Sequence, residues 1–180
     1  EGVEREFKID KVYPIDEFAK VAPELLKGFE SVYYRMGKNP EADLKVTAAL
    51  EQLRASQGRT GFGLLSIHDA DTMLGEFRLY KTDKELEYLR KACEISAQAH
   101  VAAMKFTRPG VSERQVQAVL TYEFYNRGAA REGYNHIVAS GNNATTLHYN
   151  FNDQMCNDGD LLLIDAGCEF DGYASDITRT

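Results

Sequence analysis

The sequence has no tryptophan, only three cysteines and four prolines, and fewer basic than acidic residues. Its 28 Asp and Glu exceed its 21 Lys and Arg, which gives a formal net charge of −7 at pH 7. This acidic balance excludes a general nucleic-acid binder and a polybasic protein of the membrane surface. No apolar run approaches the roughly 20 residues of a membrane-spanning helix, and no signal-peptide pattern opens the chain. We therefore expect a protein that binds neither nucleic acid nor a membrane.

The cysteines lie far apart in the sequence, at Cys93, Cys156 and Cys168. They match no C-x-x-C or other metal-binding or redox spacing. Thiols stay reduced in the cytosol, whereas disulfides form in oxidising compartments. The pattern therefore predicts reduced, buried thiols in a cytoplasmic protein.

Hydrophobic residues make up 43% of the 180 residues, enough to build a core in one medium domain or two small ones. Helical spacing predicts helices over residues 16–26 and 41–55, although Pro23 fits poorly inside the first. A short strand is predicted over residues 31–35, and residues 64–80 are predicted to be irregular or extended. This first part of the chain reads as a small α/β unit with too few strands for a sheet of its own.

A different pattern begins near residue 81. Thr82 and Glu85 fit a capping box that opens a helix running to about Phe106. The helix carries two opposed apolar stripes, which predict burial on more than one side. The members of the two stripes are Leu86, Leu89, Cys93, Ala97, His100 and Met104, and Tyr88, Ala92, Ile95, Ala99, Ala102 and Phe106.

A second helix and two strands follow. Ser112 and Gln115 fit another capping box, and Gly128 closes the helix. Strands are predicted at about residues 137–140 and 161–166. Helices followed by strands indicate an α+β fold class, with a domain boundary between residues 78 and 79.

Two aspartates flank a predicted hairpin turn at Asp171-Gly172. A four-residue loop would pair Asp165 directly with Asp176. A two-residue loop would place Asp176 opposite Gly167 and diagonal to Asp165. In either register, side-chain alternation puts both carboxylates on the same face, and directly opposed Cβ atoms are about 5 Å apart.

Two carboxylates this close repel each other and need a counter-charge unless water surrounds them. The strand before Asp165 is apolar on both faces, which argues against a fully exposed pair. Arg179 is a candidate partner, but its odd separation from Asp176 should point it to the opposite face. Oxygen ligands on rigid strands favour Mn²⁺, Mg²⁺ or a pair of hard metal ions over structural zinc.

The residues around the pair resemble a known metal-site signature. The run Asp165-Ala-Gly-Cys-Glu-Phe-x-Gly-Tyr-Ala-x-Asp176-Ile-Thr-Arg-Thr is similar to that of aminopeptidase P, in the family of pita-bread metallopeptidases. Upstream, Tyr134-Asn135-x-Ile137-Val138-x-Ser140-Gly141-x-Asn143 and Leu147-His148-Tyr149 also resemble this family, as do residues 76–79 and 84–90. The resemblance covers residues 76–180 and, more loosely, 1–75.

The resemblance implies a fold, a reaction and roles for three residues. Residues 79–180 would be the first part of a pita-bread catalytic domain, and 1–78 the C-terminal part of a smaller α/β N-terminal domain. Asp165 would chelate one Mn²⁺ ion and Asp176 would bridge two, so that a bridging hydroxide attacks the scissile carbonyl. The substrates would be peptides with proline at the second position. A homodimer or homotetramer is also implied.

The histidines call for separate interpretations. On position alone, His148 would be a structural hydrogen-bonding residue; the resemblance instead implies that it contacts substrate and stabilises the tetrahedral intermediate. His100 lies on an apolar stripe and is predicted to be a core histidine. His136 is predicted to be a surface or packing residue.

The resemblance also implies metal ligands that these residues do not supply, namely a histidine and two glutamates from later strands. We therefore expect a fragment of a longer protein, or one chain of a nicked protein whose second chain carries the rest, inactive by itself. Prolidase is the alternative activity, since it shares the metal motif, and creatinase shares the scaffold without metals. A non-catalytic peptide-binding module of the same fold is the alternative from another class.

Overall fold

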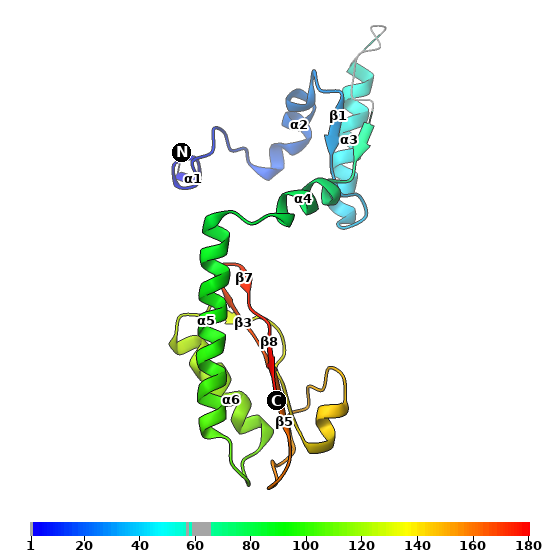
Figure 1. Cartoon of the computed structure of the whole chain (residues 1–180). Coiled ribbons are helices and arrows are strands. Elements are labelled where there is room, and N and C mark those ends of the chain that lie inside the picture. The colour runs from blue at the N-terminus through cyan, green and yellow to red at the C-terminus, as the bar shows by residue number, and fades with distance from the viewer. Residues whose placement is uncertain (1, 57, 59–65) are drawn as a thin grey trace. The chain divides into compact units, whose positions relative to one another are not determined.

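The computed structural model describes residues 2–56, 58 and 66–180. The chain divides into two compact units, residues 1–80 and 81–180. The boundary predicted between residues 78 and 79 lies close to this division. Figure 1 shows the helices and strands of each unit.

The first unit is a small α/β arrangement. Strands β1 and β2 pair in parallel, with Val32 opposite Ile67. Leu50 and Leu53 of α3 form its buried core, against the partly buried Leu26 and Val32. The elements in chain order are α1 (Gly2–Phe7), η1 (Ile15–Glu17), α2 (Phe18–Leu26), β1 (Ser31–Tyr33), α3 (Pro40–Ser56), β2 (Ser66–His68) and α4 (Ala70–Leu79).

The helices predicted over 16–26 and 41–55 are confirmed as α2 and α3, and Pro23 lies inside α2. The prediction of irregular structure over 64–80 is wrong for α4, and residues 64 and 65 lie outside the described residues. Asp69 caps α4, because its side chain accepts a hydrogen bond from the backbone N–H of Asp71. None of the side chains of α4 is buried, although Ala70, Met73, Leu74 and Phe77 follow helical spacing.

The second unit is α+β, as predicted. Its elements in chain order are α5 (Asp83–Phe106), α6 (Glu113–Asn126), β3 (Arg131–Glu132), β4 (Ile137–Ser140), η3 (Gly141–Thr145), β5 (Leu162–Ala166), β6 (Cys168–Phe170), β7 (Tyr173–Ala174) and β8 (Ile177–Arg179). Both predicted capping boxes are present, Thr82 with Glu85 at α5 and Ser112 with Gln115 at α6.

The strands of this unit form two antiparallel three-stranded sheets, with the orders β3-β6-β7 and β4-β5-β8. Helices α5 and α6 cover one face (Figure 1). There Val138 and Ile164 pack in one core with Ile95, Leu120 and Phe124 of the helices. On the opposite face, the side chains of a second cluster lie under the segment that follows β4, and its members are Ile137, Ala139, Leu163, Ala144 and Tyr149.

Only one of the two apolar stripes predicted on α5 is buried as a stripe. Ala92, Ile95 and Ala99 are buried, as expected for the second stripe. In the first stripe Cys93 and Met104 are exposed, and only His100 is buried. The prediction of burial on two sides is therefore wrong within this unit, and so is the prediction that Cys93 is buried. Cys156 and Cys168 are buried, and all three cysteines are free thiols.

Candidate metal centre

The register of one hairpin sets the positions of the two aspartates. β5 pairs with β8, with Asp165 opposite Thr178, and β6 pairs with β7, with Phe170 opposite Tyr173. Both ladders follow the same register, and Phe170 pairs with Tyr173, so the turn consists of the two residues Asp171 and Gly172. Of the two predicted alternatives, the structure therefore has the one in which Asp176 lies diagonal to Asp165.

The hairpin ladder is interrupted at Gly167, between β5 and β6. A Cβ atom on Gly167 would lie 1.8 Å from the carbonyl oxygen of Ser175 and 3.0 Å from Cε1 of Tyr134. Real Cβ atoms do not approach a backbone oxygen so closely, so only glycine fits here. The missing side chain lets the segment before Asp176 lie close against the segment after Asp165.

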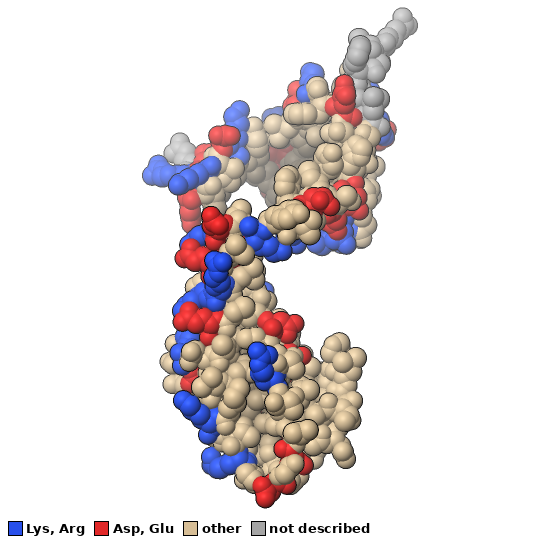
Figure 2. Space-filling model, viewed as in Figure 1, with Lys and Arg blue, Asp and Glu red and all other residues tan. Residues whose placement is uncertain are grey.

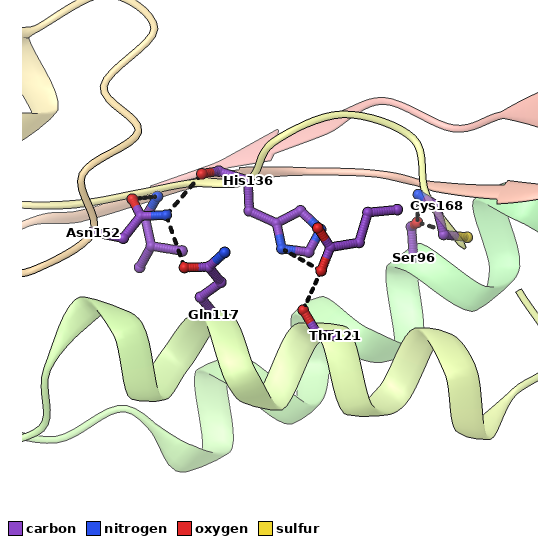
Figure 3. A network of polar contacts seen from close by, with 8 residues as sticks. Ser96, Gln117, Thr121, His136, Asn152 and Cys168 are labelled. Atoms are coloured by element: carbon purple, nitrogen blue, oxygen red, sulfur yellow. Dashed lines mark hydrogen bonds and ion pairs between the residues drawn. The ribbon is translucent and has the colours of Figure 1, made fainter. Parts of the chain in front are cut away.

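A buried polar cluster fixes the same point of the hairpin to α5. The Ser96 and Ser175 hydroxyl oxygens are 2.7 Å apart, and the backbone N–H of Cys168 lies within hydrogen-bond distance of both, at 3.3 and 3.1 Å. Figure 3 shows Ser96 on α5 beside Cys168. Hydroxyl groups in a buried site are stable only when hydrogen-bonded, so this cluster holds Ser175, the neighbour of Asp176, in one place.

Tyr134, which precedes β4, brings the two carboxylates together. Its hydroxyl oxygen lies 2.5 Å from Oδ1 of Asp165 and 2.9 Å from Oδ1 of Asp176. A phenol carries one proton, so it can donate to only one carboxylate at a time. Partial burial, together with the two carboxylates, raises the pKa of Tyr134 above its usual range. The hydroxyl therefore stays protonated and offsets part of the repulsion between the aspartates.

Sequence reasoning named Tyr134 only as part of a motif and gave it no role. The contact depends on the pairing of β4 with β5, in which Ile137 lies opposite Asp165. This pairing spans a long stretch of sequence, and no local pattern marks it. One signal could have indicated the contact: Tyr134 lies just before the strand predicted at residues 137–140, and that strand could have been considered as a neighbour of the strand that ends at Asp165.

One cavity contains all three residues predicted for the site. Asp165 is half-buried, and Asp176 and His148 are exposed. The cavity has a volume of about 360 Å³ and is lined by Tyr134, Asn135, Ile137, His148, Asn150, Asp165 and Asp176. The segment that carries His148 also exposes Leu147 and Phe151. Among the described residues in Figure 2, charged side chains gather along α5, and the surface over this segment carries few.

The other candidate residues lie away from the cavity. His100 is a core histidine, as predicted, with its ring nitrogens 2.8 and 3.1 Å from the carbonyl oxygens of Ser96 and Ile177. Arg179 lines a different cavity, together with His100, so it does not neutralise the aspartates, in agreement with the alternation argument.

His136 is buried rather than exposed, so of its two predicted roles it has the packing one. Its ring lies edge-on to Phe124, with the ring centroids 5.2 Å apart. Neither ring nitrogen has a hydrogen-bond partner among the described residues, although Nδ1 lies 3.8 Å from a carboxylate oxygen of Glu132. Burial lowers the pKa of His136, so the ring favours its neutral form.

The chemistry of the cavity suits a hard divalent cation. The carboxylates of Asp165, on β5, and Asp176, between β7 and β8, converge on a single hydroxyl, and oxygen ligands of this kind bind Mg²⁺, Ca²⁺ or Mn²⁺. Within the described ranges 2–56, 58 and 66–180, no three His, Cys, Asp or Glu side chains are grouped as a metal site would need. Among the described residues, Asp165 and Asp176 are therefore the two side chains in this cavity that could hold such an ion.

Comparison with known proteins defines the class to which this fold and this acidic cavity belong. Residues 87–180 match metallopeptidase family M24. The chain is 41% identical over 172 residues to Xaa-Pro aminopeptidase of Escherichia coli K12, covering 96% of this chain and 39% of that protein. It is 40% identical over 182 residues to Xaa-Pro aminopeptidase of Haemophilus influenzae, covering 99% of this chain and 40% of that protein.

Solved structures agree. Proline aminopeptidase P II from Yersinia pestis superposes with a TM-score of 0.88 at 41% identity, covering 98% of this chain and 41% of that one. Aminopeptidase PepP of Pseudomonas aeruginosa gives a TM-score of 0.90 at 41% identity, with coverages of 99% and 40%. The chain belongs to metallopeptidase family M24, and its fold is that of the aminopeptidase P structures. The predicted family and fold class are confirmed, and the chain spans about 40% of the length of these relatives.

Proposed function

We propose that the protein is a metal-dependent aminopeptidase that releases an N-terminal residue preceding proline. The observation that carries the proposal is the convergence of Asp165 and Asp176 on the Tyr134 hydroxyl, in a cavity that His148 also lines. Membership of family M24 supports the metal dependence. The similarity to Xaa-Pro aminopeptidases supports the substrate class and favours it over prolidase.

Each carboxylate has its own part in this proposal. As the resemblance to aminopeptidase P implies, Asp165 would hold one Mn²⁺ ion and Asp176 would be shared between two. Bound divalent metal supplies Lewis acidity that activates a water molecule for attack on the scissile carbonyl. Two carboxylates are too few to hold two ions tightly, so we propose that further ligands come from parts of the protein beyond these residues.

His148 would act on the substrate rather than on the metal. It reaches the cavity from the loop after η3, on the same side as the aspartates. From there an imidazole N–H can donate to the oxygen that becomes negative as the tetrahedral intermediate forms. Tyr134 would keep the carboxylates in position by donating a hydrogen bond to one of them at a time.

The proposal is tested on the full-length protein with Mn²⁺ and an Xaa-Pro-Xaa tripeptide. Asp176→Asn should weaken Mn²⁺ binding and lower kcat/KM by more than about 100-fold. Asp171→Asn is the matched control, because it removes the same charge from the exposed turn of the same hairpin. If Asp176→Asn binds Mn²⁺ and cleaves the tripeptide like the control, the proposed metal site is wrong.

Substrate length separates the two peptidase activities. An aminopeptidase should release the first residue of the tripeptide and act poorly on an Xaa-Pro dipeptide. A preference for the dipeptide would identify a prolidase and contradict the proposal.

Light scattering on the same sample measures the proposed homodimer or homotetramer, and cell fractionation tests the cytoplasmic location. Within the described residues, no helix is long and apolar enough to cross a membrane.

A further inference from the structure

Glu113, the first residue of α6, is a fully buried carboxylate. It forms no ion pair with a described residue, and a buried charge is stable only where hydrogen bonds replace water. Four donors surround it. Its Oε1 accepts from the backbone N–H of Ser140 at 2.7 Å and from Nδ2 of Asn143 at 3.0 Å. Its Oε2 accepts from the Tyr149 hydroxyl at 2.8 Å and from the backbone N–H of Gln154 at 3.1 Å.

The four donors match the capacity of the group. An ionised carboxylate has about four lone-pair sites, and here each oxygen accepts two hydrogen bonds. A neutral side chain of the same shape could not accept all four. The charge at position 113 is therefore tied to the segment that supplies the donors.

The donors come from both ends of the segment that carries His148. Ser140 and Asn143 precede His148, and Tyr149 and Gln154 follow it. One carboxylate thus joins the two ends and fixes the direct neighbour of His148, since Tyr149 is only 7% exposed. His148 itself has φ of 54°, an unfavourable value for a residue other than glycine, which persists only where its surroundings hold it.

We propose that Glu113 is a positioning residue that holds the 140–154 segment so that His148 faces the cavity of the two aspartates. This inference rests on the proposed substrate role of His148. Glu113 touches neither the cavity nor the aspartates, so its effect on the reaction would pass through the loop.

A second contact makes the inference testable without unfolding the protein. The Asn152 side chain accepts from the backbone N–H of Val138 at 3.0 Å and donates to the carbonyl oxygen of His136 at 2.8 Å and to Oε1 of Gln117 at 3.1 Å (Figure 3). These bonds attach the end of the same segment to β4 and α6 independently of Glu113. A variant at Glu113 should therefore keep its fold and lose the fixed loop.

Glu113→Gln in the full-length enzyme is the test. The glutamine oxygen can serve Ser140 and Asn143, but its NH₂ group then faces the Gln154 N–H, and two donors cannot bond. We expect kcat to fall by about 10- to 100-fold, because a displacement near 1 Å has that effect on a reacting group. Amide hydrogen exchange within residues 141–154 should accelerate by at least about tenfold. Tyr149→Phe, which removes one donor, should change both in the same direction and by less.

Glu123→Gln is the matched control, because it makes the same substitution in α6 at a carboxylate paired with Arg127 and remote from the loop. It should leave kcat and exchange in the loop unchanged.

A His148→Ala background completes the design. If Glu113 acts through His148, adding Glu113→Gln to His148→Ala should lower kcat by less than about threefold further.

The outcomes separate the two claims. An equal loss from Glu113→Gln in both backgrounds, or unchanged exchange in residues 141–154, overturns the positioning role. If His148→Ala keeps full activity, the proposed substrate role of His148 is wrong. The role of Glu113 is then decided by amide hydrogen exchange alone. Faster exchange confined to residues 141–154 supports the proposal that Glu113 holds this segment, and unchanged exchange refutes it.

Discussion

Replacing Gly167 with alanine would disturb the point where the two aspartates meet. The added Cβ would lie 1.8 Å from the carbonyl oxygen and 2.7 Å from the carbonyl carbon of Ser175. Comfortable contact needs about 3.5 Å, so the carbonyl oxygen of Ser175 would have to move by roughly 1.7 Å. Because that backbone leads directly into Asp176, the carboxylate must move with it.

The cost can be estimated from the same geometry. Overpacking a core with one methyl group costs typically 1–3 kcal/mol, when side chains can adjust. Here the obstacle is backbone tied to Ser96 and Cys168, so we expect a loss near or above about 3 kcal/mol in the free energy of unfolding. Urea unfolding of the metal-free protein measures this loss. Calorimetric titration with Mn²⁺ should show affinity lowered by about tenfold or more.

Gly133→Ala is the control. It lies beside the same strands, but its Cβ would meet Ala174 and Gly167 no closer than 3.4 Å. We expect it to fold and to bind Mn²⁺ almost as the natural protein does. If Gly167→Ala matched this control in stability and in metal affinity, the close approach of the two segments would not be what places Asp176.

Four further predictions each concern a single residue. Tyr134→Phe removes the hydroxyl shared by the two carboxylates and should cost the metal-free protein about 1–2 kcal/mol in urea unfolding; unchanged stability would contradict the sharing. Gly75→Ala in α4, where an added Cβ meets nothing within 4 Å, should raise the free energy of unfolding by up to about 1 kcal/mol, and a loss would contradict the helix. The backbone N–H of Thr82, followed by a tyrosine hydroxyl, lowers the pKa of Glu85 from 4.5 to about 2. The stability from these contacts is present above pH 4.5 and lost as the pH falls toward 2, so Glu85→Gln should flatten acid unfolding in that window. Burial, then a hydrogen bond to a carboxylate, raises the pKa of Tyr149 from 10.0 to about 12. That stability is present below pH 10 and lost as the pH rises toward 12, and Tyr149→Phe should remove this part of alkaline unfolding, followed by circular dichroism.

Local signals in the sequence were sufficient for much of the second unit. A capping box needs only residues three apart, so the starts of α5 and α6 were predictable from Thr82 and Ser112. Strand alternation was likewise enough to place Asp165 and Asp176 on one face. The pattern did not decide between two hairpin loops, because loop length depends on backbone geometry at Asp171 and Gly172 that either register allows.

Features that depend on distant pairing were not predictable. Tyr134 reaches the aspartates only because β4 lies beside β5, and Glu113 is buried only because the segment after β4 folds over it. The prediction that the stripe through Cys93 and Met104 is buried was wrong for a related reason. Apolar spacing shows which residues could be buried, but the residues that would cover them must come from elsewhere in the chain. Helix α4 is a different case, because Ala70, Met73, Leu74 and Phe77 follow helical spacing and this local signal was overlooked.

The hairpin has a consequence for the order of folding. Asp165 and Asp176 are eleven residues apart and meet through one short turn. Hairpins form in about 1–10 μs, before slower long-range pairing brings in β4 and Tyr134. During that interval the two acidic groups face each other without their shared proton donor. We therefore expect a divalent cation present during refolding to accelerate closure of this hairpin. The ion would then help to form the site in which it later binds.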